Sequence, residues 1–79
     1  MDESAIYTRL TEIFQSVFDD DFITATPALS AKNVDRWNSL THIRLMLTIE
    51  KAFKIKFSTS EMSKMENVGD LVTIIKART

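Results

Sequence analysis

The chain has 79 residues, of which 44% are hydrophobic and 27% are charged, which is the composition of one small globular domain. So short a chain has little mass for a deep catalytic cleft, which favours a binding, carrier or adaptor protein over an enzyme, and the absence of cysteine excludes disulfides and thiolate metal sites. The net charge is −1, but residues 1–37 carry seven acids and three bases, whereas residues 38–79 carry four acids and seven bases. This uneven distribution gives information about which partners the surface can attract rather than about the fold.

An amphipathic helix is predicted for the start of the chain. Asp2, Glu3 and Ser4 offer capping oxygens and favourable charge at its first turn. Three aspartates at 19–21 should end it, because acidic side chains oppose the dipole at a helix C-terminus. Its apolar face follows the spacing i, i+4, i+7, i+8 and i+11, with Phe18 as a further candidate for the core: Ile6, Leu10, Ile13, Phe14 and Val17.

A long connection follows at residues 19–37 and contains the only proline, Pro27. A connection of this length is uncommon in a small domain unless it is functional or packed against the rest of the fold. A short helical turn is expected within it at residues 30–34. Five apolar residues should anchor the connection to the helices: Phe22, Ile23, Leu29, Val34 and Trp37.

The second helix is predicted at residues 39–53, with Asn38 as its N-cap. Its apolar residues cover most of the helix circumference, which indicates a central helix packed on several sides. They are Leu40, Ile43, Leu45, Met46, Leu47, Ile49, Ala52 and Phe53. One polar stripe should then be its only broadly exposed face: Thr41, Arg44, Thr48 and Lys51.

The C-terminal part should form one short and one longer helix. Ile55 and Phe57 are expected to anchor a loop, and Ser58 or Ser60 to cap a helical turn at 61–64. Asn67, with Asp70 three residues later, resembles a capping box and opens a helix at 68–77. This helix should bury five apolar residues, while Lys76 and Arg78 suit its C-terminal dipole: Val68, Leu71, Val72, Ile74 and Ile75. The chain is therefore predicted to be all-α.

Three kinds of functional site receive little support from these residues. The aspartates at 19–21 lack the spacing of a calcium loop, and the lone His42 is interpreted as structural, so we expect no metal site. Helix 39–53 and its exit carry Arg44, Lys51, Lys54 and Lys56, which leaves a nucleic-acid-binding domain as a minor alternative. No segment is apolar for long enough to span a membrane, and the acidic start does not resemble a signal peptide.

Ser39 stands at the start of the second helix, within the stretch WNSLTHIRL. One interpretation is a helix cap, which is a common role for serine. A nucleophilic serine would need a base and an oxyanion hole, and the sequence indicates neither. The other interpretation is modification by another enzyme. The unpaired N–H groups and positive dipole end of a helix first turn would suit a phosphodiester on this side chain.

The stretch WNSLTHIRLMLTIEKAFKIKF resembles the phosphopantetheine attachment region of acyl carrier proteins, whose core motif reads Asp-Ser-Leu. Small stand-alone members often have tryptophan, aspartate, serine and leucine here, followed by a helix that ends in phenylalanine. The later stretch FSTSEMSKMENVGDLVTII is also similar, so the resemblance covers nearly the whole chain. The matching residues of the first stretch are Trp37, Ser39, Leu40, Ile43, Leu47, Ile49 and Phe53.

The resemblance implies a small acyl-carrier-like four-helix bundle, with three main helices, one short helix and a long first loop, in which residues 1–79 form a single acyl carrier domain. It implies 4′-phosphopantetheine attached to Ser39, with an acyl group held on the thiol as a thioester. Such a phosphoprotein catalyses nothing itself. It delivers acyl groups to acyl-activating, condensing or acyl-transfer enzymes of a fatty acid, polyketide or related pathway, after a phosphopantetheinyl transferase has modified it.

The chain departs from the family at two places. The aspartate before the serine is Asn38, which still caps the helix but removes a charge that transferases commonly contact. The usually acidic second helix carries Arg44 and Lys51 on its polar stripe, with Glu50 as its only acid. We therefore expect a specialised monomeric carrier in the cytoplasm, with dedicated partners that contact six residues: Asn38, Leu40, Thr41, Arg44, Thr48 and Lys51. A carrier-like module that is never modified remains the alternative.

Overall fold

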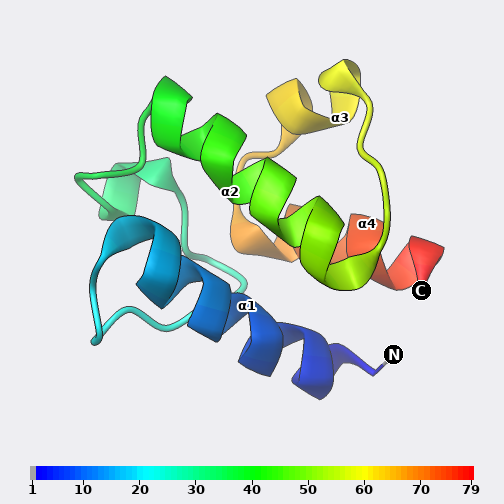
Figure 1. Ribbon diagram of the computed structural model, residues 1–79, viewed down its shortest axis with the longest axis horizontal. Helices are drawn as coiled ribbons and strands as arrows, with labels where there is room; N and C mark the ends of the chain where they lie inside the picture. Colours follow the sequence, from blue (N-terminus) through cyan, green and yellow to red (C-terminus); the bar gives the residue numbers. More distant parts are fainter. Residues whose placement is uncertain (1) are drawn as a thin grey trace.

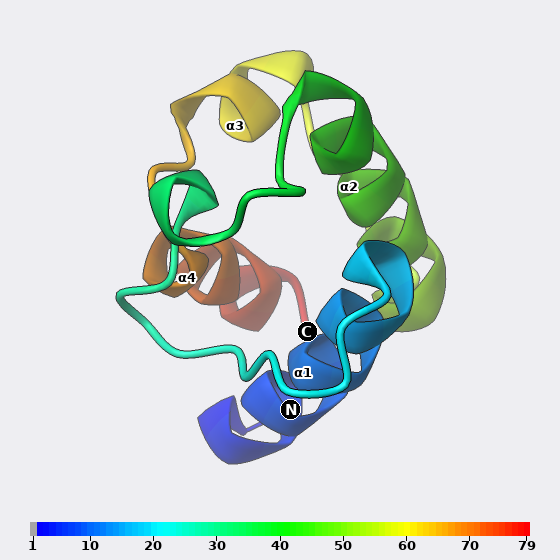
Figure 2. The same ribbon diagram turned by 90° about the vertical axis from the view of Figure 1, so that its left-hand side faces the viewer.

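The structure is a computed structural model that describes residues 2–79, and it confirms the all-helical prediction. Four α-helices and one 3-10 turn follow one another, with no strand among the described residues. Their bounds are α1 Glu3–Phe18, η1 Ala31–Asn33, α2 Ser39–Phe53, α3 Thr59–Lys64 and α4 Val68–Arg78. In Figure 1, α1 and α2 run in roughly opposite directions, and Figure 2 shows α1, α2 and α4 around a common interior.

Helix α1 begins and ends where its charged residues predict. The Asp2 side chain accepts a hydrogen bond from the Ala5 N–H, so Asp2 is the N-cap. The helix ends at Phe18, and Asp19 adopts a left-handed backbone conformation (φ 50°) in which its N–H reaches the Gln15 carbonyl. The predicted apolar face is buried, Phe18 included.

The core lies between α1, α2 and α4, and an aromatic cluster occupies one part of it. The Phe14 ring meets the Phe18 ring edge to face at 5.7 Å between centroids, and the Trp37 ring at 5.5 Å. Trp37 belongs to the long loop, so this cluster ties the end of that loop to α1. The predicted anchoring role of Trp37 is therefore confirmed.

Helix α1 and the start of α4 hold the long loop through polar contacts as well. The Thr11 hydroxyl accepts from the Ala25 N–H, and the Gln15 amide donates to the Asp21 and Ile23 carbonyls. The first N–H groups of α4 donate to loop carbonyls, from Gly69 to Pro27 and from Val68 to Leu29. A Cβ on Gly69 would lie 3.2 Å from the Pro27 oxygen, so glycine permits this close approach.

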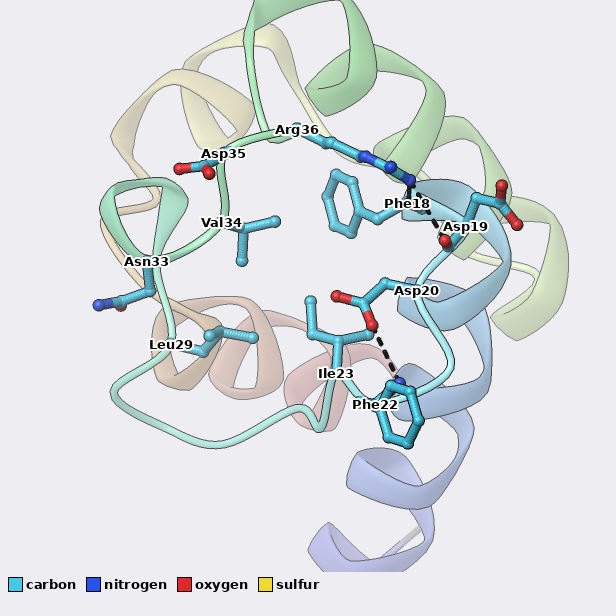
Figure 3. Close-up of a pocket in the computed structure, with 10 residues that line it drawn as sticks. All are labelled: Phe18, Asp19, Asp20, Phe22, Ile23, Leu29, Asn33, Val34, Asp35 and Arg36. Carbon is cyan, nitrogen blue, oxygen red and sulfur yellow. Dashed lines mark hydrogen bonds between the residues drawn. The ribbon is translucent and has the colours of Figure 1, made fainter.

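The prediction that Phe22 anchors the loop is wrong. Its side chain is 95% exposed, whereas Ile23 is buried and Leu29 and Val34 are half-buried as expected. The Asp20 carboxylate accepts from the Phe22 N–H and turns the chain there, so the Phe22 ring points away from the interior (Figure 3). The expected helical turn in this loop is present as η1, capped by Ser30.

Helix α2 has the predicted bounds, but it is not packed on several sides. Leu45, Met46, Ile49 and Phe53 are buried, whereas three other apolar side chains lie at the surface. Their exposed fractions are 72% for Leu40, 54% for Ile43 and 56% for Leu47. No other described element covers this side of α2, and α3 has only six residues.

Helix α3 has no fully buried residue, so the partial packing of Met62 against the core is supplemented by side-chain bonds. Ser58 is the capping serine, and the helix starts two residues before the predicted turn. Its Glu61 forms an ion pair with Arg78 of α4, and Arg78 also donates to the Lys56 carbonyl. Ile55 and Phe57, in the preceding loop, are buried as predicted.

Helix α4 opens as predicted but with a different bond pattern. Asn67 accepts from the Asp70 N–H, yet the Asp70 carboxylate accepts from the Glu66 N–H rather than from Asn67. The helix extends to Arg78, one residue beyond the predicted end, and Ile74 is only half-buried.

The ion pair between Glu61 and Arg78 predicts an unusual acid titration. Hydrogen bonds from Arg78 and from the Ser58 N–H lower the pKa of Glu61 from 4.5 to about 2. Because the folded pKa is depressed, this contribution to stability is complete above pH 4.5 and is lost as the pH falls towards about 2. In an NMR titration the Glu61 carboxyl should titrate near the bottom of this range. In Arg78→Ala the pKa of Glu61 should rise towards 4.5 but stay below it, because the Ser58 N–H bond remains, and an unchanged pKa there would contradict the assignment.

Candidate functional site

Ser39 is the first residue of α2, and its side chain is exposed. Among residues 2–79, no partner is found for its Oγ. A hydroxyl that neither caps the helix nor supports the fold is available for chemistry. The interpretation of Ser39 as a helix cap is therefore wrong.

Asn38 and Thr41 cap α2 instead. The Asn38 side-chain oxygen accepts from the Leu40 N–H at 3.0 Å and from the Thr41 N–H at 3.1 Å. The Thr41 hydroxyl accepts from the Asn38 N–H at 2.8 Å and lies 2.6 Å from the Arg36 carbonyl, to which it donates. This reciprocal pair is a capping box, and an aspartate at position 38 could accept the same two bonds.

The cap changes what the helix start offers to an anion. The sequence argument assumed unpaired N–H groups, but those of Leu40 and Thr41 already donate to Asn38. A phosphate on Ser39 would therefore be favoured by the positive end of the helix dipole more than by free backbone donors. The site suits a covalently attached anion better than a freely bound one.

A hollow lies beside Ser39, between the start of α2 and α3. Ile43 borders it on the α2 side, and Thr59, Met62 and Ser63 border it on the α3 side. Behind it is a smaller inner cavity of about 60 Å³, lined in part by Met46, Met65 and Leu71. Trp37 and His42 line both spaces, so their side chains stand between the surface hollow and the core.

His42 connects the long loop, α2 and α3. Its Nδ1 accepts from the Trp37 indole N–H at 3.0 Å, so the ring proton is on Nε2, which donates to the Met62 carbonyl at 3.0 Å. That carbonyl lies in the last turn of α3, where no helical N–H reaches it. The structural interpretation of His42 is confirmed, and sequence reasoning missed both of its partners.

The structure divides the six residues predicted to bind partners. Leu40, Arg44, Thr48 and Lys51 are exposed along the outer side of α2, near Ser39 at its start. The side chains of Asn38 and Thr41 are occupied by the cap. Sequence reasoning missed that Ile43 and Leu47 share this outer side, because their apolar character suggested burial.

Glu50 is the second feature of α2 that the sequence did not indicate. It is only 8% exposed, and its carboxylate accepts from the Phe57 N–H at 2.7 Å. The loop that follows α2 folds back to make this bond. The only acid of α2 is therefore withdrawn from the outer side of the helix, and no pattern in the sequence signals it.

A different hollow lies between the end of α1 and the long loop, away from Ser39 (Figure 3). The Arg36 guanidinium donates to the Phe18 carbonyl at 2.8 Å and to the Asp19 carbonyl at 3.2 Å. Arg36 therefore stabilises the C-terminus of α1, a role that sequence reasoning missed.

In the described part of the chain, no three acidic or histidine side chains could together hold a metal ion. No helix within residues 2–79 has the length and apolar character to cross a bilayer.

Comparisons with known proteins point in one direction. No protein-family model matches the chain. An acyl carrier protein of Borreliella burgdorferi strain ZS7 is 31% identical over 81 aligned positions, covering 99% of this chain and 98% of the relative. A holo acyl carrier protein from Geobacter metallireducens has a similar structure, with a TM-score of 0.85 and 44% identity over 90% of this chain and 82% of that one. An acyl carrier protein of Thermotoga maritima has a TM-score of 0.83 over 98% and 89% of the two chains at 23% identity, which supports the fold alone.

Proposed function

Because the chain belongs to the acyl carrier protein family, as its full-length relative at 31% identity shows, it is a carrier rather than a catalyst, and we propose that Ser39 is its attachment point for 4′-phosphopantetheine. The observation that carries this proposal is the free Ser39 hydroxyl at the start of α2. Helix capping by Asn38 and Thr41 leaves that hydroxyl without any structural duty, so esterifying it costs the fold no hydrogen bond.

The residues around Ser39 fit such a group. The phosphate would sit at the positive end of α2, and the hollow between α2 and α3 gives the arm a surface to lie against. When bound, the group supplies the thiol that this cysteine-free chain lacks, and a thiol can hold an acyl group as a thioester. Ile43 and Met62 offer apolar contact, while Thr59 and Ser63 offer hydroxyls, to whatever occupies the hollow.

The finer parts of the function rest on the same premise. We propose that residues 1–79 act as one acyl carrier domain, modified by a phosphopantetheinyl transferase in the cytoplasm. Partner enzymes that load, condense or transfer acyl groups then meet Ser39 and the outer side of α2. The basic residues Arg44 and Lys51 on that side support a specialised carrier of lipid, polyketide or related synthesis over a general fatty acid carrier.

Intact-mass measurement tests the attachment. The purified chain is incubated with coenzyme A and a phosphopantetheinyl transferase, and we expect a mass gain of roughly 340 Da, the size of the arm. Ser39→Ala should abolish the gain. Ser63→Ala is the matched control, because Ser63 borders the same hollow but its hydroxyl donates to the Thr59 carbonyl, so this variant should still be modified. Modification of Ser39→Ala would overturn the assignment.

A carrier-like module that binds partners without modification is the second candidate, and Asn38 is the residue that favours it. An aspartate usually precedes the modified serine in this family, and the neutral Asn38 removes its charge. If the wild-type chain gains no mass and Asn38→Asp does, the unmodified module is the better description of this protein.

A further inference from the structure

Three large aliphatic side chains form a strip on the outer side of α2. Leu40, Ile43 and Leu47 are spaced at i, i+3 and i+7, and each is more than half exposed, between 54% and 72%. Apart from Phe22, they are the exposed large hydrophobic residues of the described chain. The strip begins one residue after Ser39, so a protein that covers it also reaches the proposed attachment point.

Basic side chains lie directly beside this strip. Arg44 is four residues after Leu40, and Lys51 is four residues after Leu47, so each cation neighbours an exposed leucine on the helix surface. Past the helix end, Lys56 lines a shallow hollow together with Leu47, Lys51 and the largely buried Glu50, whose carboxylate already accepts from the Phe57 N–H. Among residues 2–79, the ion pairs involve only Arg9 with Glu12 and Arg78 with Glu61, so these three cations are uncompensated.

On α2 itself the two cations, Arg44 and Lys51, outnumber the one acid. The only acid of the helix, Glu50, is buried and accepts from the Phe57 N–H at 2.7 Å. Figure 1 shows that the segment directly after α1, which carries three aspartates at 19–21, lies at the other end of the molecule from the last turn of α2. An approaching acidic surface is therefore attracted towards α2 and repelled from the loop.

We propose that α2 docks enzymes whose surface presents an apolar groove rimmed by carboxylates, an inference that rests on the proposed carrier function. The groove covers the strip of Leu40, Ile43 and Leu47. The carboxylates on its rim pair with the side chains of Arg44, Lys51 and Lys56. A protein fits better than an anionic membrane, because Thr48 separates the two cations of the helix and three aliphatic residues make a short strip for a bilayer.

The first such enzyme is a phosphopantetheinyl transferase that modifies this chain, and its kinetics provide the test. In the double variant Arg44→Glu, Lys51→Glu we expect kcat/KM for modification to fall by about tenfold or more. For the wild type, kcat/KM should also fall between about 50 mM and about 300 mM salt. The double variant Lys32→Glu, Lys76→Glu is the control, because both lysines are exposed and lie on other elements, so the same change in net charge should leave kcat/KM near the wild-type value.

Each outcome decides a different question. A mass gain on Ser39 with undiminished kcat/KM in the α2 variant overturns the acidic-partner inference and leaves the carrier function intact. Equal losses in both double variants overturn it too, because net charge alone would explain them. Sedimentation of the wild type with phosphatidylglycerol vesicles, or self-association abolished by the α2 variant, would assign the strip to a lipid surface or a second copy instead. If the wild type gains no mass, the attachment proposal fails, and the docking inference is then decided by whether the transferase binds the α2 variant more weakly than the wild type and the control variant.

Discussion

Replacing Phe14 with alanine should cost about 3–5 kcal/mol of folding free energy, the usual range for a buried aromatic residue in a core. Phe14 is completely buried and contacts the rings of Phe18 and Trp37, so its loss opens a cavity where α1 meets the long loop. A domain of this size has only about 4–12 kcal/mol of stability, so the variant should lose much of it. Chemical denaturation followed by circular dichroism measures the loss, and the melting temperature should fall by on the order of 20 °C.

Phe22→Ala provides the control, because it removes the same side chain from a position that is 95% exposed. We expect a change within about 0.5 kcal/mol, as for ordinary surface substitutions. A loss as large as that of Phe14→Ala would mean that Phe22 packs into the core in solution. The pair also tests the single loop anchor that the sequence predicted wrongly.

Periodic helices were predictable because their pattern is local. The burial of Ile6, Leu10 and Phe14 on one face of α1 follows from spacing alone. The same method failed for α2, because a helix wheel records which residues are apolar but not how many neighbours the fold supplies. Whether Leu40 and Leu47 are covered depends on where the other elements pack, which their own segment does not encode.

Around the candidate site, the cap of α2 was predictable from the sequence, but the longer-range bonds were not. The stretch WNSLTHIRL predicted the start of α2 at Ser39 and the cap at Asn38, since both depend on neighbouring residues. The partners of His42 and Glu50 lie 20 and 7 residues away, at the Met62 carbonyl and the Phe57 N–H. Contacts of this kind form only after the loops have closed, so a single sequence gives no signal for them.

Replacing His42 with phenylalanine should destabilise the protein by about 2–4 kcal/mol, although the new side chain is apolar and similar in shape. The ring would leave the Trp37 indole N–H and the Met62 carbonyl without partners, and both atoms lie in partly buried surroundings. Denaturation measurements give the total loss. An effect below about 0.5 kcal/mol would show that water replaces both partners without penalty.

Two further variants separate the two bonds of His42. In His42→Asn the amide oxygen lies near the position of Nδ1 and can still accept from Trp37, but the side chain is too short to reach Met62. In His42→Gln the amide nitrogen lies near the position of Nε2 and can still donate to the Met62 carbonyl, while the acceptor for Trp37 is lost. Amide hydrogen exchange in α3 should therefore accelerate in the asparagine variant, and the indole N–H resonance of Trp37 should shift in the glutamine variant. If both variants change both signals equally, His42 acts only as a filler of space. If the signals separate, the bond to Met62 is what holds α3 against α2, and it fixes one wall of the hollow beside Ser39.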